Sequence, residues 1–457
     1  MTPSTSPATS RRVLALALPM TLANVTTPLL GFVGATVIGR LGDAALLGAM
    51  ALGAVIFDAI FWSFGSLRMA TAGLTAQAVG ADDSAEVDRT LARALAAAVG
   101  VGLLIVVLQG PIGRAAFALS GASPAVIAAL SAYFHIRIFA APFTLANYAI
   151  LGSVLGRGRT DLGLILQVSI NLTNIVLTLA LVLWADMSVA GAGLATLIAE
   201  AAGAGLGLIL LARLGSRPFA VPFRVVRDPR ALARMLSVNA DVMIRTLLLV
   251  GCITLFSALG ARSGDVVLAA NAVLWNLFMI GGFFLDGFAT AAETLCGQAV
   301  GARDEARFRR AATLSLLWCL AFGGAIAGGF LLAGHAFIDA VTTSPEVRAM
   351  ARIYLLPAAL APFLAALPVA FDGIYIGATW TRAMRNLMLV ASAAYGLALL
   401  AAHAAGLGNG GLWLSFLILL AGRGISQALA YPGLTRRTFS PAGAIPREKH
   451  AGDFTPA

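Results

Sequence analysis

Long apolar runs recur along this chain and restrict it to very few folds. Twelve of them approach or exceed the ~20 residues that a helix needs to cross the hydrocarbon core of a membrane. They lack the strict alternation of barrel strands, so we expect an all-α polytopic membrane protein with twelve transmembrane helices. In the first half the runs lie at about 13–39, 45–68, 91–117, 126–155, 162–184 and 188–212. In the second half they lie at about 235–260, 266–296, 311–334, 348–378, 386–406 and 409–432.

The composition explains why lipid must be the solvent for most of the chain. Hydrophobic residues make up 59% and charged residues 11%, whereas a soluble domain has about 25% charged residues. No soluble fold can bury so much apolar surface. The net charge of +10 is spread over short loops, so we expect no nucleic-acid partner. The three cysteines, Cys252, Cys296 and Cys319, lie in apolar runs and are expected to be buried small hydrophobic residues.

The second half of the chain repeats the first. The sequence Gln77-Ala78-Val79-Gly80-Ala81 returns as Gln298-Ala299-Val300-Gly301-Ala302, and the offset is 298 − 77 = 221. The same offset relates Ser123-Pro124 to Ser344-Pro345, Gly156 to Gly377 and Thr160 to Thr381. Each half holds six spans, an even number, so both halves enter the membrane from the same side. We therefore expect two six-helix lobes related by a parallel pseudo-two-fold repeat.

The repeat and the loops define four predicted segments. They are an N-terminal lobe (1–212), a basic cytoplasmic linker (213–234), a C-terminal lobe (235–434) and a cytoplasmic tail (435–457). The linker contains six arginines and three prolines. Two interpretations of it stay open: a segment that binds anionic lipid headgroups, and a solvated connector between the lobes.

Arginine and lysine lie mostly on one side of this topology. With the N-terminus inside, the inner segments carry 22 of these residues and the outer loops carry 4. Basic residues accumulate in cytoplasmic loops, so we expect both termini in the cytoplasm and the protein in the cell inner membrane.

Several classes of enzyme and pump are excluded by missing motifs. Lys449 is the only lysine, so the chain has no Walker A motif for ATP. The four histidines are scattered and no HExxH or Gly-x-Ser-x-Gly sequence occurs. We therefore expect no enzyme activity, no cofactor and no metal site. A two-lobe helical protein with a few buried charges is typical of a secondary transporter.

Several short sequences together resemble one family of transporters. They include Leu16-Ala17-Leu18-Pro19-Met20, Leu67-Arg68-Met69, Asp286-Gly287-Phe288-Ala289, Gly297-Gln298-Ala299-Val300-Gly301-Ala302-Arg303-Asp304 and Asp372-Gly373. In these residues the chain resembles the multidrug and toxic compound extrusion (MATE) family, in its DinF-like branch. The resemblance implies two six-helix lobes around a central cavity. It also implies export of bulky, often cationic, organic compounds in exchange for H⁺ or Na⁺.

The chain departs from the family pattern at two N-lobe positions. Relatives that resemble it carry an aspartate in the first helix where this chain has Gly34, and often another in the fifth helix where it has Thr178. Both usual N-lobe carboxylates are therefore missing. The sequence does not decide which other carboxylate couples transport to a cation.

Acidic residues inside apolar runs are the candidates for that coupling, because a charge in the membrane interior is costly and is functional by default. The candidates are Asp286, Asp372, Glu200, Asp58, Glu293 and Asp241. We favour Asp286 and Asp372 as carboxylates that face the cavity. Asp286 and Glu293 are two helical turns apart and share one face.

Neutral polar residues in the apolar runs of the predicted N-terminal lobe could hydrogen-bond near Glu200. We expect a hydrogen-bonded cluster close to Glu200, serving either coupling or helix packing, formed by Asn147, Asn171, Asn174, Thr178 and Thr196. Asp241 and Arg245 are four residues apart, so an ion pair within one helix is the favoured interpretation. Arg68, Arg137 and Arg423 are expected to be structural partners or snorkelling residues.

Two prolines, Pro19 and Pro28, interrupt the hydrogen bonding of the first predicted helix. They mark either a hinge or a static kink.

Two alternatives to an antiporter stay open. One is a flippase or exporter of lipid-linked or polysaccharide intermediates, which requires a basic cavity for a phosphate group. The other is a membrane scaffold or receptor. The expected partners are small-molecule substrates, H⁺ or Na⁺ and membrane lipids, and the expected state is a monomer.

Overall fold

The computed structural model describes residues 8–440, which fold into helices and contain no β-strand. Twelve candidate spans in this part of the chain are long and apolar enough to cross a membrane, as the apolar runs predicted. The N-terminal lobe contains α1 (Ser10–Gly39), α2 (Ala44–Ser63), α3 (Gly65–Gly80), α4 (Ser84–Val107), α5 (Gln109–Ser120), α6 (Pro124–Arg137), α7 (Ala141–Gly156), α8 (Thr160–Leu179) and α9 (Ser188–Arg213).

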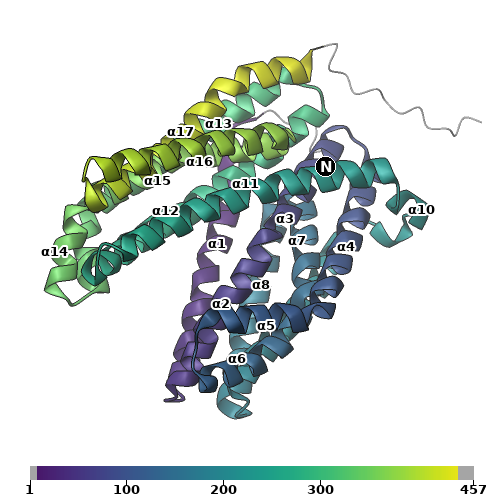
Figure 1. The fold of residues 1–457 in the computed structure, drawn as a ribbon. Coiled ribbons are helices and arrows are strands. Elements are labelled where there is room, and N and C mark those ends of the chain that lie inside the picture. Colours follow the sequence, from purple (N-terminus) through teal and green to yellow (C-terminus); the bar gives the residue numbers. More distant parts are fainter. Residues whose placement is uncertain (1–7, 441–457) are drawn as a thin grey trace, which may run out of the picture.

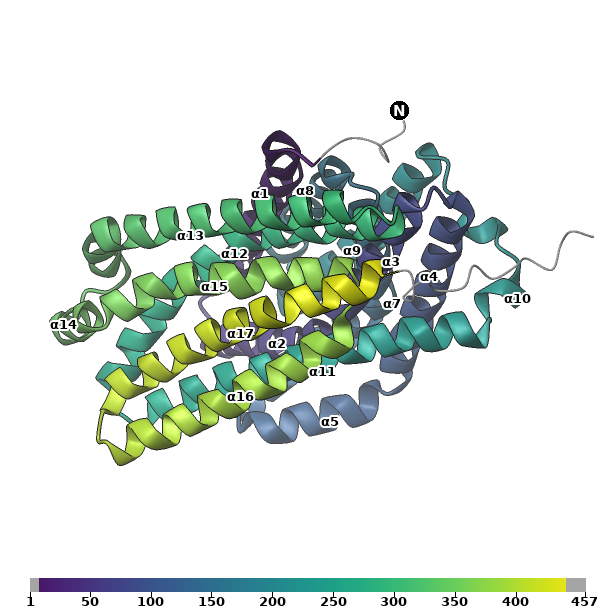
Figure 2. The same ribbon diagram turned by 90° about the horizontal axis from the view of Figure 1, so that it is seen from above.

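The short helix α10 (Phe223–Val226) lies in the linker between the lobes. The C-terminal lobe contains α11 (Pro229–Ala261), α12 (Asp265–Gly301), α13 (Glu305–Val341), α14 (Pro345–Ile353), α15 (Leu355–Gly377), α16 (Thr381–Ala404) and α17 (Gly408–Phe439). In Figure 1 the helices of the two lobes run in clearly different directions, and the lobes meet near the end that carries the N-terminus. Figure 2 shows the C-terminal lobe from above, with α14 and α10 at opposite ends of the molecule.

Each lobe has its own apolar core. Phe57, Tyr133 and Phe134 are completely or almost completely buried in the N-terminal lobe. Phe256 and Trp413 fill the corresponding interior of the C-terminal lobe. The first turns of α1 are an exception, because they pack into the core of the C-terminal lobe. Helix α1 therefore belongs to one lobe by sequence and contacts both.

The predicted duplication is confirmed at the helix ends. Asp83 caps α4 by accepting a hydrogen bond from Glu86 N (2.8 Å), and Asp304, at the repeat offset, caps α13 by accepting one from Arg307 N (2.9 Å). Ser123 caps α6 and Ser344 caps α14, again at the repeat offset. Equivalent residues therefore begin equivalent helices, because an N-cap side chain satisfies amides that the helix leaves free.

Several predicted boundaries are wrong. The run 91–117 is not one span: α4 begins at Ser84 and ends at Val107, and α5 is a separate helix. The run 348–378 divides at Tyr354 into α14 and α15, and the run 45–68 divides at Phe64 and continues to Gly80. Apolar residues stand on both sides of the break at Phe64, so hydropathy does not reveal it. The break at Tyr354 follows a polar helix, because α14 carries Glu346, Arg348 and Arg352.

The predicted limits of the C-terminal lobe also differ from the observed helix limits. Helix α11 begins at Pro229, before the expected boundary at 235, and α17 continues to Phe439, into the segment expected to be a tail. The remainder of that predicted tail, 441–457, lies outside the described residues.

The lobes approach each other so closely at one end that only glycine fits. A Cβ atom added to Gly80 at the end of α3 would lie 2.0 Å from the carbonyl oxygen of Gln298. A Cβ atom on Gly301 at the end of α12 would lie 1.9 Å from the carbonyl oxygen of Gln77. The repeated sequence therefore forms the closed end of the space between the lobes.

The linker is held against the start of α4. Ser216 Oγ donates to one carboxylate oxygen of Asp88, and Arg217 N donates to the other at 3.0 Å. Two side chains of this segment, Phe219 and Phe223, are 79% and 70% exposed. The linker is thus an anchored segment with aromatic rings on its surface.

Candidate functional site

A cavity of about 230 Å³ lies between the lobes. Its wall comes mainly from α11, α12, α15 and α17 of the C-terminal lobe, and α3 of the N-terminal lobe contributes Arg68 and Met69. Apolar side chains form part of the lining, among them Leu249, Ile253 and Phe278. The charged side chains in the lining are Arg68, Arg245, Asp286, Glu293, Asp372 and Arg423.

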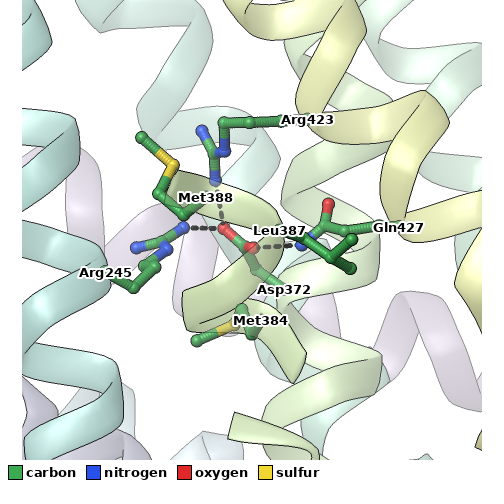
Figure 3. Close-up of a pocket in the computed structure, with 7 residues that line it drawn as sticks. All are labelled: Arg245, Asp372, Met384, Leu387, Met388, Arg423 and Gln427. Atoms are coloured by element: carbon green, nitrogen blue, oxygen red, sulfur yellow. Dashed lines mark hydrogen bonds and ion pairs between the residues drawn. The ribbon is translucent and has the colours of Figure 1, made fainter. Parts of the chain in front are cut away.

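Asp372 of α15 is the centre of a buried ion cluster at the edge of this cavity (Figure 3). Arg423 Nη2 of α17 donates to Asp372 Oδ2 at 2.7 Å, and Arg245 of α11 pairs with the same oxygen. Gln427 Nε2 donates to Asp372 Oδ1 at 2.9 Å. Two guanidinium groups therefore share one carboxylate, which leaves a local excess of one positive charge.

The geometry of three helices produces this cluster. Arg423 and Gln427 are four residues apart, so both project from one face of α17 towards α15. The side chains of α16, Met384, Leu387 and Met388, cover the cluster (Figure 3). Apolar cover strengthens the ion pairs and makes any unpaired charge there expensive.

Glu293 and Asp286 of α12 line the same cavity but have different surroundings. Glu293 is only 3% exposed, and its Oε1 has no hydrogen-bond partner among the described residues. Asp286 Oδ2 accepts a hydrogen bond from Asn24 Nδ2 of α1 at 3.1 Å. Neither carboxylate forms an ion pair with any residue between 8 and 440.

The expected ion pair between Asp241 and Arg245 within α11 is wrong. Asp241 Oδ1 pairs instead with Arg385 Nη1 of α16 at 2.6 Å, and Thr381 Oγ1 donates to Asp241 Oδ2 at 3.2 Å. Arg245 turns to Asp372. Spacing along one helix permits contact but does not compel it, and here both side chains have better partners on neighbouring helices.

Comparison with known proteins gives the same picture as the fold and the cavity. The family model described as MatE matches residues 19–180 and 242–402, one segment in each lobe. The chain is 40% identical over 422 residues to DNA damage-inducible protein F of Escherichia coli, covering 90% of each protein. The chain belongs to the MATE family, in its DinF-like branch. Its MATE relatives are transporters rather than enzymes. The chain is therefore a multi-pass membrane protein of a family of efflux transporters.

Two more distant matches extend over nearly the whole of this MATE protein. It is 28% identical to the probable multidrug resistance protein NorM of Xanthomonas campestris pv. campestris, covering 97% of this chain and 99% of that protein. A crystal structure of MATE in the bent conformation superposes with a TM-score of 0.85 at 17% identity, covering 94% of this chain and 95% of that chain. The structural likeness shows a shared fold along both lobes.

The polar residues expected around Glu200 in the MATE N-terminal lobe form three separate groups. Of these five residues, only Asn147 bonds to Glu200, and its Nδ2 lies 2.7 Å from Glu200 Oε2. Asn174 Nδ2 donates to Thr196 Oγ1 at 3.0 Å, and Thr178 Oγ1 donates to Asn174 Oδ1 at 3.2 Å. The single cluster that the sequence suggested is therefore wrong, because residues on α7, α8 and α9 bond to whichever helix they face.

The third group joins α8 to α1. Asn171 Nδ2 donates to Thr26 Oγ1 of α1 at 2.7 Å. At Gly34, the position where relatives carry an aspartate, the methyl end of Met50 would lie 3.2 Å from an added Cβ atom. Helix α1 runs continuously through Pro19 and Pro28, and their role as hinges stays a prediction.

Other N-lobe candidates have simpler surroundings. Asp58 of α2 is exposed. Arg137 lies 4.5 Å above the ring of Phe57, so it is a structural cation–π partner as expected. These residues are absent from the lining of the inter-lobe cavity.

Sequence reasoning found the carboxylates of the cavity and missed most of their partners. Asp286, Glu293 and Asp372 stand out as rare acids in apolar runs. Asn24 and Gln427 are common helix residues and give no such signal. Gln427 could have been found only together with Arg423, because two polar residues one turn apart in an apolar span indicate a polar stripe that faces another helix.

Proposed function

We propose that this chain is a secondary active transporter that exports bulky organic compounds, often cationic, in exchange for H⁺ or Na⁺. The observation that carries the proposal is the cavity between the two lobes, because it combines apolar walls with the unpaired carboxylates of Asp286 and Glu293. Membrane transporters commonly bind substrate and ion at the interface of two repeats, which then rock against each other. The relative from Xanthomonas carries the name multidrug resistance protein, which agrees with efflux of such compounds.

Glu293 and Asp286 are the residues we assign to cation exchange. A buried carboxylate without an ionic partner requires either a proton or a metal cation to offset its desolvation. Glu293 meets this condition most fully, since it is 3% exposed and one of its oxygens is unsatisfied. Asp372 differs because two guanidinium groups already neutralise it. We therefore assign Asp372 to holding α11, α15 and α17 together around the exchange site.

The orientation proposed for the chain is with both termini in the cytoplasm of an inner membrane. The excess of arginine on that side supports it. The linker supports it as well, because the exposed Phe219 and Phe223 stand among arginines, a combination suited to an anionic membrane surface. One chain supplies both lobes and the cavity, so a monomer suffices for this mechanism.

The proposal is tested with purified protein in proteoliposomes under a pH gradient or a sodium gradient imposed separately. We expect substrate efflux to follow one of the two gradients. Glu293→Gln is expected to lose at least about 90% of gradient-driven efflux, because the neutral amide cannot release a cation. Glu305→Gln is the matched control, since Glu305 lies outside the cavity and pairs with Arg309 at the start of α13. Full gradient-driven efflux by Glu293→Gln would remove Glu293 from the mechanism.

One observation favours the flippase as a second candidate function. Three arginines line the cavity, more than the sequence suggested, and a phosphate group on a lipid-linked intermediate is a natural partner for guanidinium. Translocation of a fluorescent lipid-linked phosphate in the same proteoliposomes, without any dependence on a cation gradient, would favour the flippase over the antiporter.

A further inference from the structure

We propose that Arg68 makes this cavity selective for amphoteric organic compounds, whose carboxylate binds the Arg68 guanidinium while a cationic group faces Asp286 and Glu293. The inference rests on the proposed export function and narrows its substrate class. Its starting point is a charge in the cavity that the protein itself leaves unmatched.

Arg68 is that unmatched charge. It lines the cavity from α3 and is half-buried. Its guanidinium forms no hydrogen bond and no ion pair with any residue between 8 and 440. The other two arginines of the cavity, Arg245 and Arg423, both pair with Asp372. Arg68 therefore keeps its planar array of donors available, and that array matches the two oxygens of a carboxylate.

The position of Arg68 along its span argues against snorkelling. The second candidate span runs from Ala44 to Gly80, and Arg68 follows closely after the break at Phe64 near the middle of it. A guanidinium so far from either end of a span cannot easily reach the membrane surface. Of the two roles expected for Arg68, structural partner and snorkelling residue, this position disfavours snorkelling. A ligand that brings negative charge into the cavity would offset the free-energy cost of keeping the Arg68 guanidinium away from water.

Helix α12 supplies the complementary charge to the same cavity. Asp286 and Glu293 of α12 face the same space and have no cationic partner within ion-pair distance among the described residues. The cavity therefore offers carboxylates to a cationic group and a guanidinium to an anionic one. Met69 and Phe278 provide apolar surface for the body of the compound.

A purely cationic compound fits this charge pattern less well. The cluster of Arg245 and Arg423 on a single aspartate carries a net positive charge, and Arg68 adds another on the opposite lobe. A ligand with a cation alone satisfies Glu293 and Asp286 and leaves Arg68 unmatched. A ligand with both charges satisfies both sides, which costs less in a site of low dielectric constant.

The test compares binding of two dyes that differ only in this charge. Rhodamine B carries a cationic ring system and a free carboxylate, and its ethyl ester keeps the cation and lacks the carboxylate. Fluorescence anisotropy with the purified full-length protein in detergent gives both dissociation constants. We expect rhodamine B to bind about tenfold more tightly than the ester, as for one charge-assisted pair.

Variants then locate the preference. Arg68→Gln should reduce it to less than about twofold, and Arg68→Lys, which keeps the charge, should retain most of it. Arg114→Gln is the matched control, since Arg114 is exposed on α5, outside the cavity. Gel filtration and thermal unfolding check that each variant is folded, and the comparison of the two dyes on the unaltered protein needs no variant.

Three outcomes decide the inference. Loss of the preference in Arg68→Gln alone supports it. Equal affinity of the unaltered protein for the two dyes would overturn it, and so would an undiminished preference in folded Arg68→Gln. If rhodamine B binds preferentially through Arg68 but no gradient drives its efflux from proteoliposomes, the selectivity of the cavity stands and the antiport proposal fails.

Discussion

Gln77 and Gln298 tie the two lobes together by the same interaction made in opposite directions. Gln77 Nε2 of the N-terminal lobe donates to the carbonyl oxygen of Gly377 at 2.8 Å, and Gln298 Nε2 of the C-terminal lobe donates to that of Gly156 at 3.2 Å. The offset of the repeat relates the two glutamines to each other, and it relates the two glycines in the same way. An ancient duplication has thus produced a symmetric closure at the end where the lobes meet.

The other amide atom of each glutamine strengthens this closure. Arg12 Nη2 donates to Gln298 Oε1 at 3.2 Å, and Arg234 Nη2 donates to Gln77 Oε1 at 3.4 Å. Each arginine stands near the start of the first long helix of its own lobe and reaches a glutamine of the other. The carbonyl and the amino group of both glutamines are therefore occupied by the opposite lobe.

The double variant Gln77→Ala with Gln298→Ala is predicted to open this end of the molecule. It removes two inter-lobe hydrogen bonds to main-chain carbonyls, each contributing about 1 kcal/mol. Spin labels at Ala85 and Arg310, exposed residues on opposite lobes, report the separation by double electron–electron resonance after the three native cysteines are replaced. We expect a longer-distance population to appear. An unchanged distance distribution would mean that the glutamines do not hold the lobes closed.

A second prediction concerns the glycines beside these glutamines. Gly80→Leu should prevent the lobes from closing, because even a Cβ atom there would lie 2.0 Å from the carbonyl oxygen of Gln298. We expect efflux to fall by at least about tenfold while the protein still inserts, because each lobe keeps its own core. Gly100→Leu is the matched control: this glycine lies in α4 with nothing within 4 Å of an added Cβ atom. Efflux in proteoliposomes and protein recovery from the membrane check both variants.

The sequence predicted the architecture because its signals are local. Apolar runs mark spans wherever they occur, and the duplicated turns carry identical capping residues, such as Ser123 and Ser344. The break at Phe64 depends instead on how helices pack, since the residues around it are as apolar as the rest. At Tyr354 the predicted run was drawn too long, because it included Arg348 and Arg352 of the polar helix α14. For this reason the number of spans is predictable and some of their limits are not.

The acids of the cavity were predictable from local sequence, whereas their partners depend on contacts between distant helices. Asp372 is conspicuous as an acid in an apolar run, but its partner Arg245 is far away in the sequence, on another helix. The local alternative, Asp241 four residues before Arg245, was the obvious choice from spacing. Only the packing of α11 against α16 and α17, from which Arg245 reaches Asp372 of α15, decides between the two acids.

Removal of the shared carboxylate gives a third prediction. Asp372→Asn leaves Arg245 and Arg423 buried together without a counter-charge, and breaking a buried pair in this way costs about 3–5 kcal/mol. We expect a lower unfolding temperature and loss of efflux in protein that still inserts. Adding Arg245→Gln to this variant should restore part of the unfolding temperature, because one unmatched charge is gone. Normal efflux by Asp372→Asn would exclude Asp372 from the transport cycle.

Asp241 of α11, a buried acid outside the cavity, provides the test that separates structure from coupling. Asp241→Asn removes the ion pair with Arg385, whose side chain is 28% exposed and can turn towards water. Its loss is therefore expected to lower stability by less than the loss of Asp372, by about 1–2 kcal/mol. The ion that drives efflux should stay the same, because Asp241 is absent from the cavity lining. Thermal unfolding and efflux under separate pH and sodium gradients check this, and a changed ion dependence would make Asp241 a coupling residue after all.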